Sequence, residues 1–268
     1  MPHEGYIDAG NGGYIADFLY LCSRYQHKKR VSMKRIILPL LLLVAAVAGA
    51  SAQNIQLHYD FGRALYDELD TDANRRPRLT TTVEMFKPDK WGSTFFFVDM
   101  DYADNEVKSA YWEISRKLKF WQAPISLQLE YDGGLNYIKD SYLAGLSYGW
   151  DKKDFSAGFS LSALYKYLCS NYSNSYQLTA TWYWNFCGGK CSFSGFADFW
   201  REEHTDMEGK AHDYTFIAEP QFWVNLNKFR GVSDAFRLSI GTEWEVSHNF
   251  ALLSGWYLNP TLALKWEF

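Results

Sequence analysis

Apolar and polar residues alternate along residues 258–268, the last segment of the chain. Leu262, Leu264 and Trp266 belong to the apolar set, and the residues between them are small or charged. A two-residue period places the two sets on opposite faces of a β-strand. In water, such an apolar terminal strand would invite edge pairing, whereas a closed barrel in lipid gives it a partner on each side and apolar surroundings. We therefore predict that Leu262, Leu264 and Trp266 face lipid.

The same alternation recurs along the chain. Between Phe155 and Ala163, every second residue is Phe, Ala or Leu, and the residues between them are Ser or Gly. Segments of about 10 to 15 residues with this pattern suit strands that cross a membrane at a tilt. We predict an all-β fold, a closed antiparallel transmembrane β-barrel of about 12 strands. Its strands are expected at 54–66, 77–88, 91–102, 108–120, 123–134, 139–151, 153–166, 174–187, 190–203, 212–227, 235–247 and 257–268.

A soluble, exported barrel of the lipocalin type is the alternative fold. Such a barrel is also antiparallel, but it turns its apolar face inward around a ligand and needs about eight strands. This chain has room for more strands, which favours the membrane barrel.

The sequence before the barrel has the features of an export signal. Met33 begins a short basic segment, residues 36–47 are apolar apart from one proline, and Ala52 ends an Ala-Ser-Ala cleavage site. We predict a signal peptide over residues 33–52, with cleavage near Ala52, and a barrel over residues 53–268. A retained membrane anchor is the alternative. The acidic and Gly-rich residues 1–32 do not suit a signal peptide, so we expect them to be an upstream extension outside the fold.

Composition agrees with a membrane barrel. Aromatic residues make up 18% of the chain, yet the mean hydropathy is −0.31. Helical membrane proteins have continuous apolar spans, whereas half of each barrel strand faces a polar lumen. Six of the 27 Lys and Arg residues and three of the 31 Asp and Glu residues precede Gln53, so the remainder carries a net charge of −7. Without a basic patch or a nucleic-acid motif, we exclude nucleic acid as a partner.

Two cysteines flank a tight turn. Cys187 and Cys191 enclose Gly-Gly-Lys, and in the oxidising cell envelope they either form a hairpin disulfide or remain free thiols. Both alternatives are open, and Cys169 has no evident partner. No Cys/His spacing matches a metal site, and we expect no cofactor.

The candidate site residues are aromatic and acidic residues that share strand faces. Stacking on an inward aromatic ring contributes about 1–3 kcal/mol per base in single-strand binders. Neighbouring carboxylates can accept hydrogen bonds from sugar hydroxyls or base edges. The alternative is that inward Phe side chains only fill a narrow barrel. The alternation predicts six inward-facing candidates. These are Phe95, Phe97 and Asp99 of one strand, Glu113 of the next, and Phe196 and Asp198 of a later one.

Residues 83–91, 95–99, 112–115 and 195–199 resemble segments of the nucleoside-specific channel-forming (Tsx-like) outer-membrane family. This resemblance implies a monomeric 12-stranded barrel with a narrow lumen lined by aromatic and ionisable residues. It also implies that the solute contacts are Phe95, Phe97, Asp99, Glu113, Phe196 and Asp198.

We therefore expect a channel in the outer membrane of a Gram-negative bacterium that takes up small solutes passively, with nucleosides as the solute. The final strand, ending in Phe268, is similar to the signal by which barrels are recognised for assembly. It implies the barrel assembly machinery as a partner beside outer-membrane lipid. The alternatives are a barrel enzyme that acts on lipid and a structural or adhesin barrel without transport. We expect no enzyme, because His58 has no neighbouring motif that would activate a nucleophile and the later histidines lie at predicted loop edges.

Overall fold

The computed structural model describes residues 52–71, 76–103, 106–135, 138–170 and 172–268. These residues belong to one compact unit, Ala48–Phe268. The predicted upstream extension and nearly all of the predicted signal peptide lie outside the described residues, so they stay predictions.

Among the described residues, thirteen strands form one sheet. Helical segments α3 (Gly62–Leu65) and η1 (Asp67–Leu69) lie between β1 and β2, and η2 (Leu226–Lys228) follows β11. None of the described helices is long and apolar enough to cross a membrane. The strands are β1 (Ala52–Asp60), β2 (Leu79–Asp89), β3 (Gly92–Ala103), β4 (Glu106–Leu118), β5 (Ile125–Gly134), β6 (Ser141–Asp151), β7 (Ala157–Leu168), β8 (Ser173–Phe186), β9 (Cys191–Thr205), β10 (Ala211–Ala218), β11 (Gln221–Asn225), β12 (Leu238–His248) and β13 (Trp256–Glu267).

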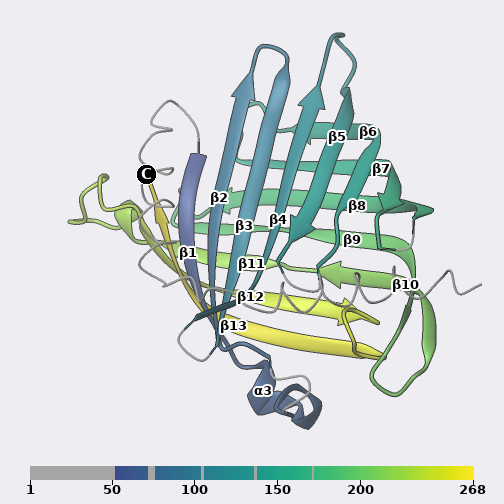
Figure 1. Cartoon of the computed structure of the whole chain (residues 1–268). Coiled ribbons are helices and arrows are strands. Elements are labelled where there is room, and N and C mark those ends of the chain that lie inside the picture. Colours follow the sequence, from purple (N-terminus) through teal and green to yellow (C-terminus); the bar gives the residue numbers. More distant parts are fainter. Residues whose placement is uncertain (1–51, 72–75, 104–105, 136–137, 171) are drawn as a thin grey trace, which may run out of the picture. The chain divides into compact units, whose positions relative to one another are not determined.

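The sheet closes on itself. β1 pairs with β13 in antiparallel register, with Asn54 opposite Glu267, so the first and last strands complete the ring. In Figure 1, β1 to β5 form the near wall, and the later strands pass behind them. Closure gives every strand a partner on both sides, which is what a sheet in lipid requires. The predicted all-β, closed antiparallel barrel is confirmed.

One predicted strand is interrupted. The segment predicted as 212–227 forms β10 and β11, which follow one another along the chain and both pair with β9 and β12. Pro220 lies in the break and has no N–H to donate to the ladder. Gly195 of β9 lies against this break with φ of +154°, and a Cβ there would collide with the carbonyl oxygen of Glu219. β10 and β11 share one strand position, so the described barrel has twelve positions, as predicted.

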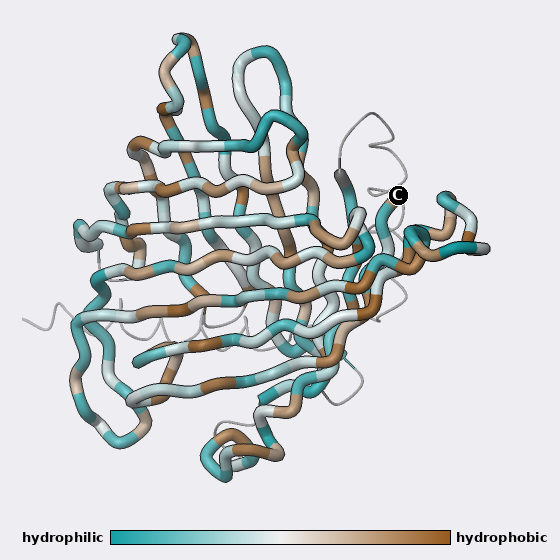
Figure 2. The backbone as a smooth tube through the Cα atoms, turned by 180° about the vertical axis from the view of Figure 1, so that it is seen from behind, coloured by the Kyte–Doolittle hydropathy of each residue, from teal (hydrophilic) through white to brown (hydrophobic). Residues whose placement is uncertain are grey.

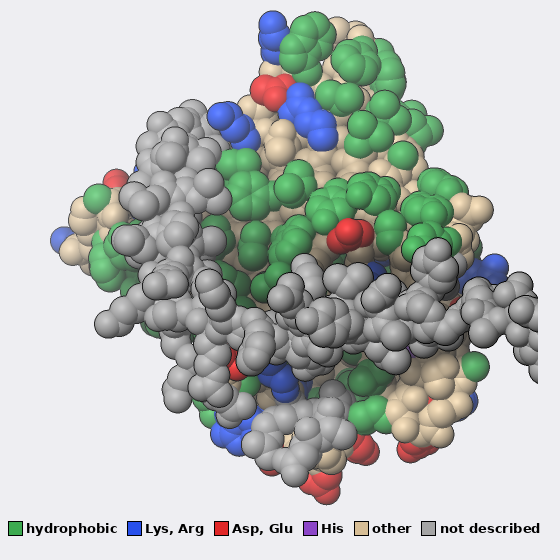
Figure 3. All heavy atoms as spheres, viewed as in Figure 1, with side chains coloured by type: hydrophobic (Ala, Val, Ile, Leu, Met, Phe, Trp, Pro, Cys, Tyr) green, Lys and Arg blue, Asp and Glu red, His purple; other side chains and the backbone are tan. Residues whose placement is uncertain are grey.

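The two faces of the sheet differ in polarity. On β13, Leu262 is 57% exposed and Leu264 44% exposed, whereas Asn259 and Thr261 are buried inside the barrel. Figure 2 shows apolar and polar residues alternating along the strands. In Figure 3, hydrophobic side chains cover much of the near outer wall, and most charged side chains lie toward its ends. Leu262, Leu264 and Trp266 thus lie on the outer face, as the alternation predicts.

The cysteines at the turn between β8 and β9 are unpaired. Cys187 and Cys191 are free thiols among the described residues, which corresponds to the second of the two alternatives. Cys191 lies opposite Phe186 in the strand register, while Cys187 belongs to the turn and has φ of +53°. The hairpin therefore does not place the two cysteines directly opposite each other, and the disulfide, one of the two open alternatives, is not formed.

Candidate functional site in the barrel lumen

All six predicted site residues lie on the inner face. On β3, Phe97 lies opposite Glu113 of β4, and Asp99 lies opposite Thr82 of β2. Phe95 shares this face because it is two residues from Phe97. On β9, Phe196 and Asp198 face inward beside the polar residues of β8, Thr181 and Thr179. The sites on β3 and β4 are adjacent, whereas β9 belongs to another part of the wall.

An aromatic row lies beside carboxylates on β3 and β4. The ring centroid of Phe97 is 6.0 Å from that of Phe95 and 5.8 Å from that of Tyr111. The Tyr111 hydroxyl donates a hydrogen bond of 2.6 Å to Oε1 of Glu113. Asp99 Oδ1 accepts a hydrogen bond of 2.5 Å from the Thr82 hydroxyl. The wall therefore combines an apolar ring surface with oriented polar oxygens.

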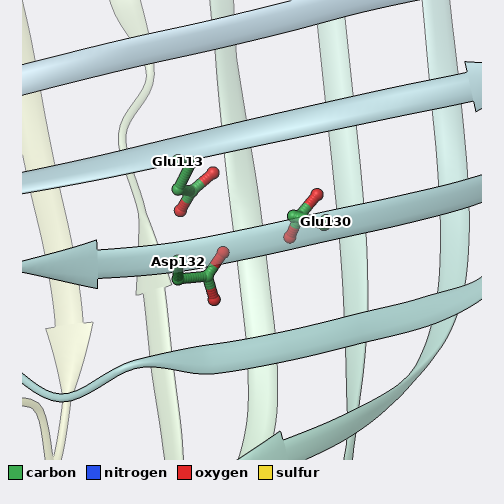
Figure 4. Close-up of side chains that lie close together, drawn as sticks. All are labelled: Glu113, Glu130 and Asp132. Carbon is green, nitrogen blue, oxygen red and sulfur yellow. The ribbon is translucent and has the colours of Figure 1, made fainter.

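Three carboxylates converge next to this row. Glu113 of β4 lies opposite Asp132 of β5, and Glu130 is two residues from Asp132 on the same face. One carboxylate oxygen from each lies within 4.8 Å of the others. Figure 4 shows the three side chains approaching one another from two neighbouring strands. In the sequence, Glu130 and Asp132 belong to the polar set that alternates with the apolar residues of 125–131, but this alternation does not contain the cross-strand register that brings them to Glu113.

Lys166 of β7 faces this carboxylate cluster, which consists of Glu113, Glu130 and Asp132. Its Nζ lies 3.4 Å from Oδ2 of Asp132 and donates a hydrogen bond of 2.7 Å to Oε1 of Gln177. The same ammonium lies 5.0 Å from the ring centroid of Trp200 on β9. Lys166 thus links three parts of the wall through one charge.

A second group of charges lies near β1 and β12. Arg76, in the connection before β2, donates a hydrogen bond of 2.7 Å from Nε to Oδ2 of Asp60 and one of 2.6 Å from Nη2 to Oε2 of Glu245. Glu219 lies within electrostatic range of Glu243, Glu245, Asp99 and Arg76. Acidic side chains from β3 and from β12 therefore approach the same region of the lumen.

Trp223 of β11 fills part of the interior. The residue is 0% exposed, and its Nε1 donates a hydrogen bond of 3.1 Å to Oε1 of Gln221. The Lys265 ammonium lies 4.6 Å from its ring centroid, and the His58 ring meets it edge-on at 6.2 Å. Large side chains thus narrow the lumen on this side.

The fold and the lumen together define a class of protein. An antiparallel sheet that closes between β1 and β13, with an apolar outer face and a polar inner face, is the architecture of an outer-membrane β-barrel. The family model described as "Domain of unknown function (DUF5020)" matches residues 52–268. The chain belongs to this family. A search of the curated proteins found no match.

The chain also aligns with solved structures, two of which are porins by name. The NanC porin aligns with a TM-score of 0.52 at 7% identity, over 81% of this chain and 100% of that chain. The KdgM porin aligns with a TM-score of 0.46 at 9% identity, over 82% of this chain and 99% of that chain. LpxR from Salmonella typhimurium aligns with a TM-score of 0.43 at 8% identity, over 81% of this chain and 100% of that chain. The likeness to NanC concerns the fold.

Proposed function

We propose that this barrel is a channel in the bacterial outer membrane for passive uptake of small solutes, with nucleosides as the preferred class. The observation that carries the proposal is the row of Phe95, Phe97 and Tyr111 beside Asp99 and Glu113 on the inner face. A nucleoside has a flat ring that can stack on the aromatic row and hydroxyls that can donate hydrogen bonds to the carboxylates. It therefore matches both kinds of side chain on this wall.

A transport role fits the inner face better than a rigid structural role does. Its polar groups come from many strands and form a series of hydrogen-bonding sites rather than one deep apolar pocket. Several weak sites in succession allow a solute to enter and also to leave. The similarity of Phe95, Phe97, Asp99, Glu113, Phe196 and Asp198 to positions of the Tsx-like family supports nucleosides as the solute.

Liposome swelling with a nucleoside and with a sugar of similar size tests the proposal. For the wild-type barrel we expect faster, saturable entry of the nucleoside. Replacing Phe95 and Phe97 with Ala should widen the lumen and yet raise the nucleoside concentration for half-saturation by about tenfold or more, because two ring contacts are lost. The matched control replaces Phe159 and Phe193, which are exposed on the outer face, with Ala and should leave the selectivity unchanged.

Three outcomes would contradict the proposal. Equal entry of the two solutes into wild-type liposomes would remove the nucleoside preference and leave a general channel. Faster entry of every solute in the Phe95→Ala, Phe97→Ala variant, with no loss of saturation, would mean that the rings only fill space. Hydrolysis of lipid by the purified barrel, abolished by replacing one Ser or His, would instead favour an enzyme.

A further inference from the structure

We propose that the carboxylate cluster of Glu113, Glu130 and Asp132 binds a divalent cation, and that calcium is the ion it prefers. The three side chains supply only oxygen ligands, and one oxygen of each lies within 4.8 Å of the others. They project from β4 and β5, which are paired in continuous antiparallel register, so the backbone holds the ligands in place (Figure 4). The inference depends on the lumen geometry and not on transport.

Two buried oxygens point independently to a ligand. Asp132 is 4% exposed, and its Oδ1 has no hydrogen-bond partner among the described residues. Asp198 of β9 is 7% exposed, and its Oδ1 likewise lacks a partner in the described part of the chain. Asp198 lies close enough to Glu113 and Glu130 to repel both. Because a buried carboxylate oxygen without a partner is costly, these atoms favour a bound cation.

The local charge balance points the same way. Among the described residues, the Lys166 ammonium attracts Asp132, Glu130 and Asp198, and the Lys117 ammonium attracts Glu130 and Asp151. Lys166 approaches Asp132, and Lys117 attracts Glu130 while its Nζ donates a hydrogen bond of 3.0 Å to Ser160. When ionised, the four carboxylates Glu113, Glu130, Asp132 and Asp198 outnumber the two ammonium groups, one of which is shared with Asp151, and a divalent cation would reduce this excess of negative charge.

The ligand chemistry selects among cations. Calcium takes 6–8 oxygen ligands in a flexible arrangement at about 2.3–2.6 Å, so ligands on opposite sides of the ion are roughly 4.6–5.2 Å apart. Magnesium requires a near-ideal octahedron at about 2.0–2.1 Å, and zinc prefers nitrogen and sulfur ligands. An all-oxygen site of carboxylates from two strands suits calcium, which accepts irregular oxygen coordination, better than magnesium or zinc.

Terbium luminescence measures the site directly in the purified, chelator-treated barrel. Terbium replaces calcium at oxygen sites, and Tyr111, hydrogen-bonded to Glu113 at 2.6 Å, is placed to sensitise its emission. We expect saturable binding of one ion per barrel, reversed by calcium at lower concentrations than by magnesium. The Glu113→Gln, Glu130→Gln variant should bind at least about tenfold more weakly, because two charged ligands are lost. The control Glu84→Gln removes an inner-face charge on β2 and should bind as the wild type does.

The proposal fails if the wild-type barrel shows no saturable binding at millimolar concentrations of terbium or calcium. This measurement on the wild type alone can overturn the proposal. It also fails if the double variant binds as tightly as the wild type. Displacement by magnesium as readily as by calcium would overturn the choice of calcium. If the double variant does not fold, Asp132→Asn alone answers the same question. Ion binding and solute flux are measured separately, so failure of the site and failure of the channel are distinguishable.

Discussion

Asp206 organises the connection between β9 and β10. Its Oδ1 accepts hydrogen bonds of 2.9 Å from the backbone N–H groups of Glu208 and Lys210, and its Oδ2 accepts one of 2.8 Å from Nε2 of His212. The hydrogen bond from His212, followed by those from the backbone, lowers the pKa of Asp206 to about 2. The carboxylate is thus the acceptor that holds this connection together.

Acid should loosen this connection. Because the folded pKa lies below the ordinary value of 3.8, the stabilisation by Asp206 is present above about pH 4 and is lost as the pH falls toward 2. Hydrogen exchange of the peptide covering 206–212 tests this. At pH 7 the Asp206→Asn variant should exchange faster than the wild type, because a charge-assisted acceptor is lost.

Near pH 2, the difference in exchange between the Asp206→Asn variant and the wild type should be clearly smaller than at pH 7, since about half of the wild-type carboxyls are then protonated. Asp213→Asn changes an exposed neighbour in β10 and serves as the control, with wild-type exchange expected at both pH values. A difference between Asp206→Asn and the wild type that is equally large at pH 2 and pH 7 would contradict the assigned role of the charge.

At the scale of the strand, a substitution in β13 tests which face of the barrel contacts lipid. Leu264 is 44% exposed on the outer face and pairs with Leu57 of β1 and Ile240 of β12. Leu264→Arg should lower the free energy of folding into bilayers by about 2–4 kcal/mol, because the charge would enter the hydrocarbon region. Denaturant titration of the barrel in phospholipid vesicles measures this difference.

Leu258 provides the matched control on the same strand and face. It lies near the start of β13, toward the end of the barrel, and is also exposed. Leu258→Arg should cost only about 0–1 kcal/mol, since charges near the interface remain solvated. Equal costs at the two positions, or no cost at Leu264, would show that this face does not meet the bilayer core.

At the scale of the whole barrel, charge dominates the lumen. Within the described residues, inner-face acidic side chains outnumber basic ones. They include Asp60, Glu84, Asp99, Asp101, Glu113, Glu130, Asp132, Asp198, Glu219, Glu243 and Glu245, against Arg76, Lys117, Lys166 and Lys265. Carboxylates that line a pore attract cations and repel anions.

We therefore expect cation selectivity. In a planar bilayer with a salt gradient, the reversal potential of the wild-type channel should have the sign that is expected when cations carry most of the current. The Asp101→Asn, Glu245→Gln variant should move the reversal potential toward zero, because it removes two carboxylates from the inner face. Glu203→Gln with Asp213→Asn removes two exposed acidic groups and should leave it unchanged. An anion-selective wild type would contradict this account.

The interrupted strand shows what a local pattern does and does not predict. The alternation across 212–227 correctly places Glu219, Gln221 and Trp223 on one face, and Pro220 is visible in the sequence. The split into β10 and β11 depends on β9 as well, where Gly195 lets the backbone of Glu219 approach. The alternation of residues within 212–227 carries no information about this contact with another strand, so it does not predict the split.

The sequence by itself determined the polarity of each strand face, the twelve strand positions and the inward direction of Phe95, Phe97, Asp99 and Glu113, because a two-residue period is a property of consecutive residues. Only the tertiary structure decided which inward residues meet. Glu130 and Asp132 reach Glu113 through the register of β4 against β5, and Asp198 reaches them because the sheet closes. Register depends on how many strands share one ring and how they stagger, and therefore on the whole barrel at once.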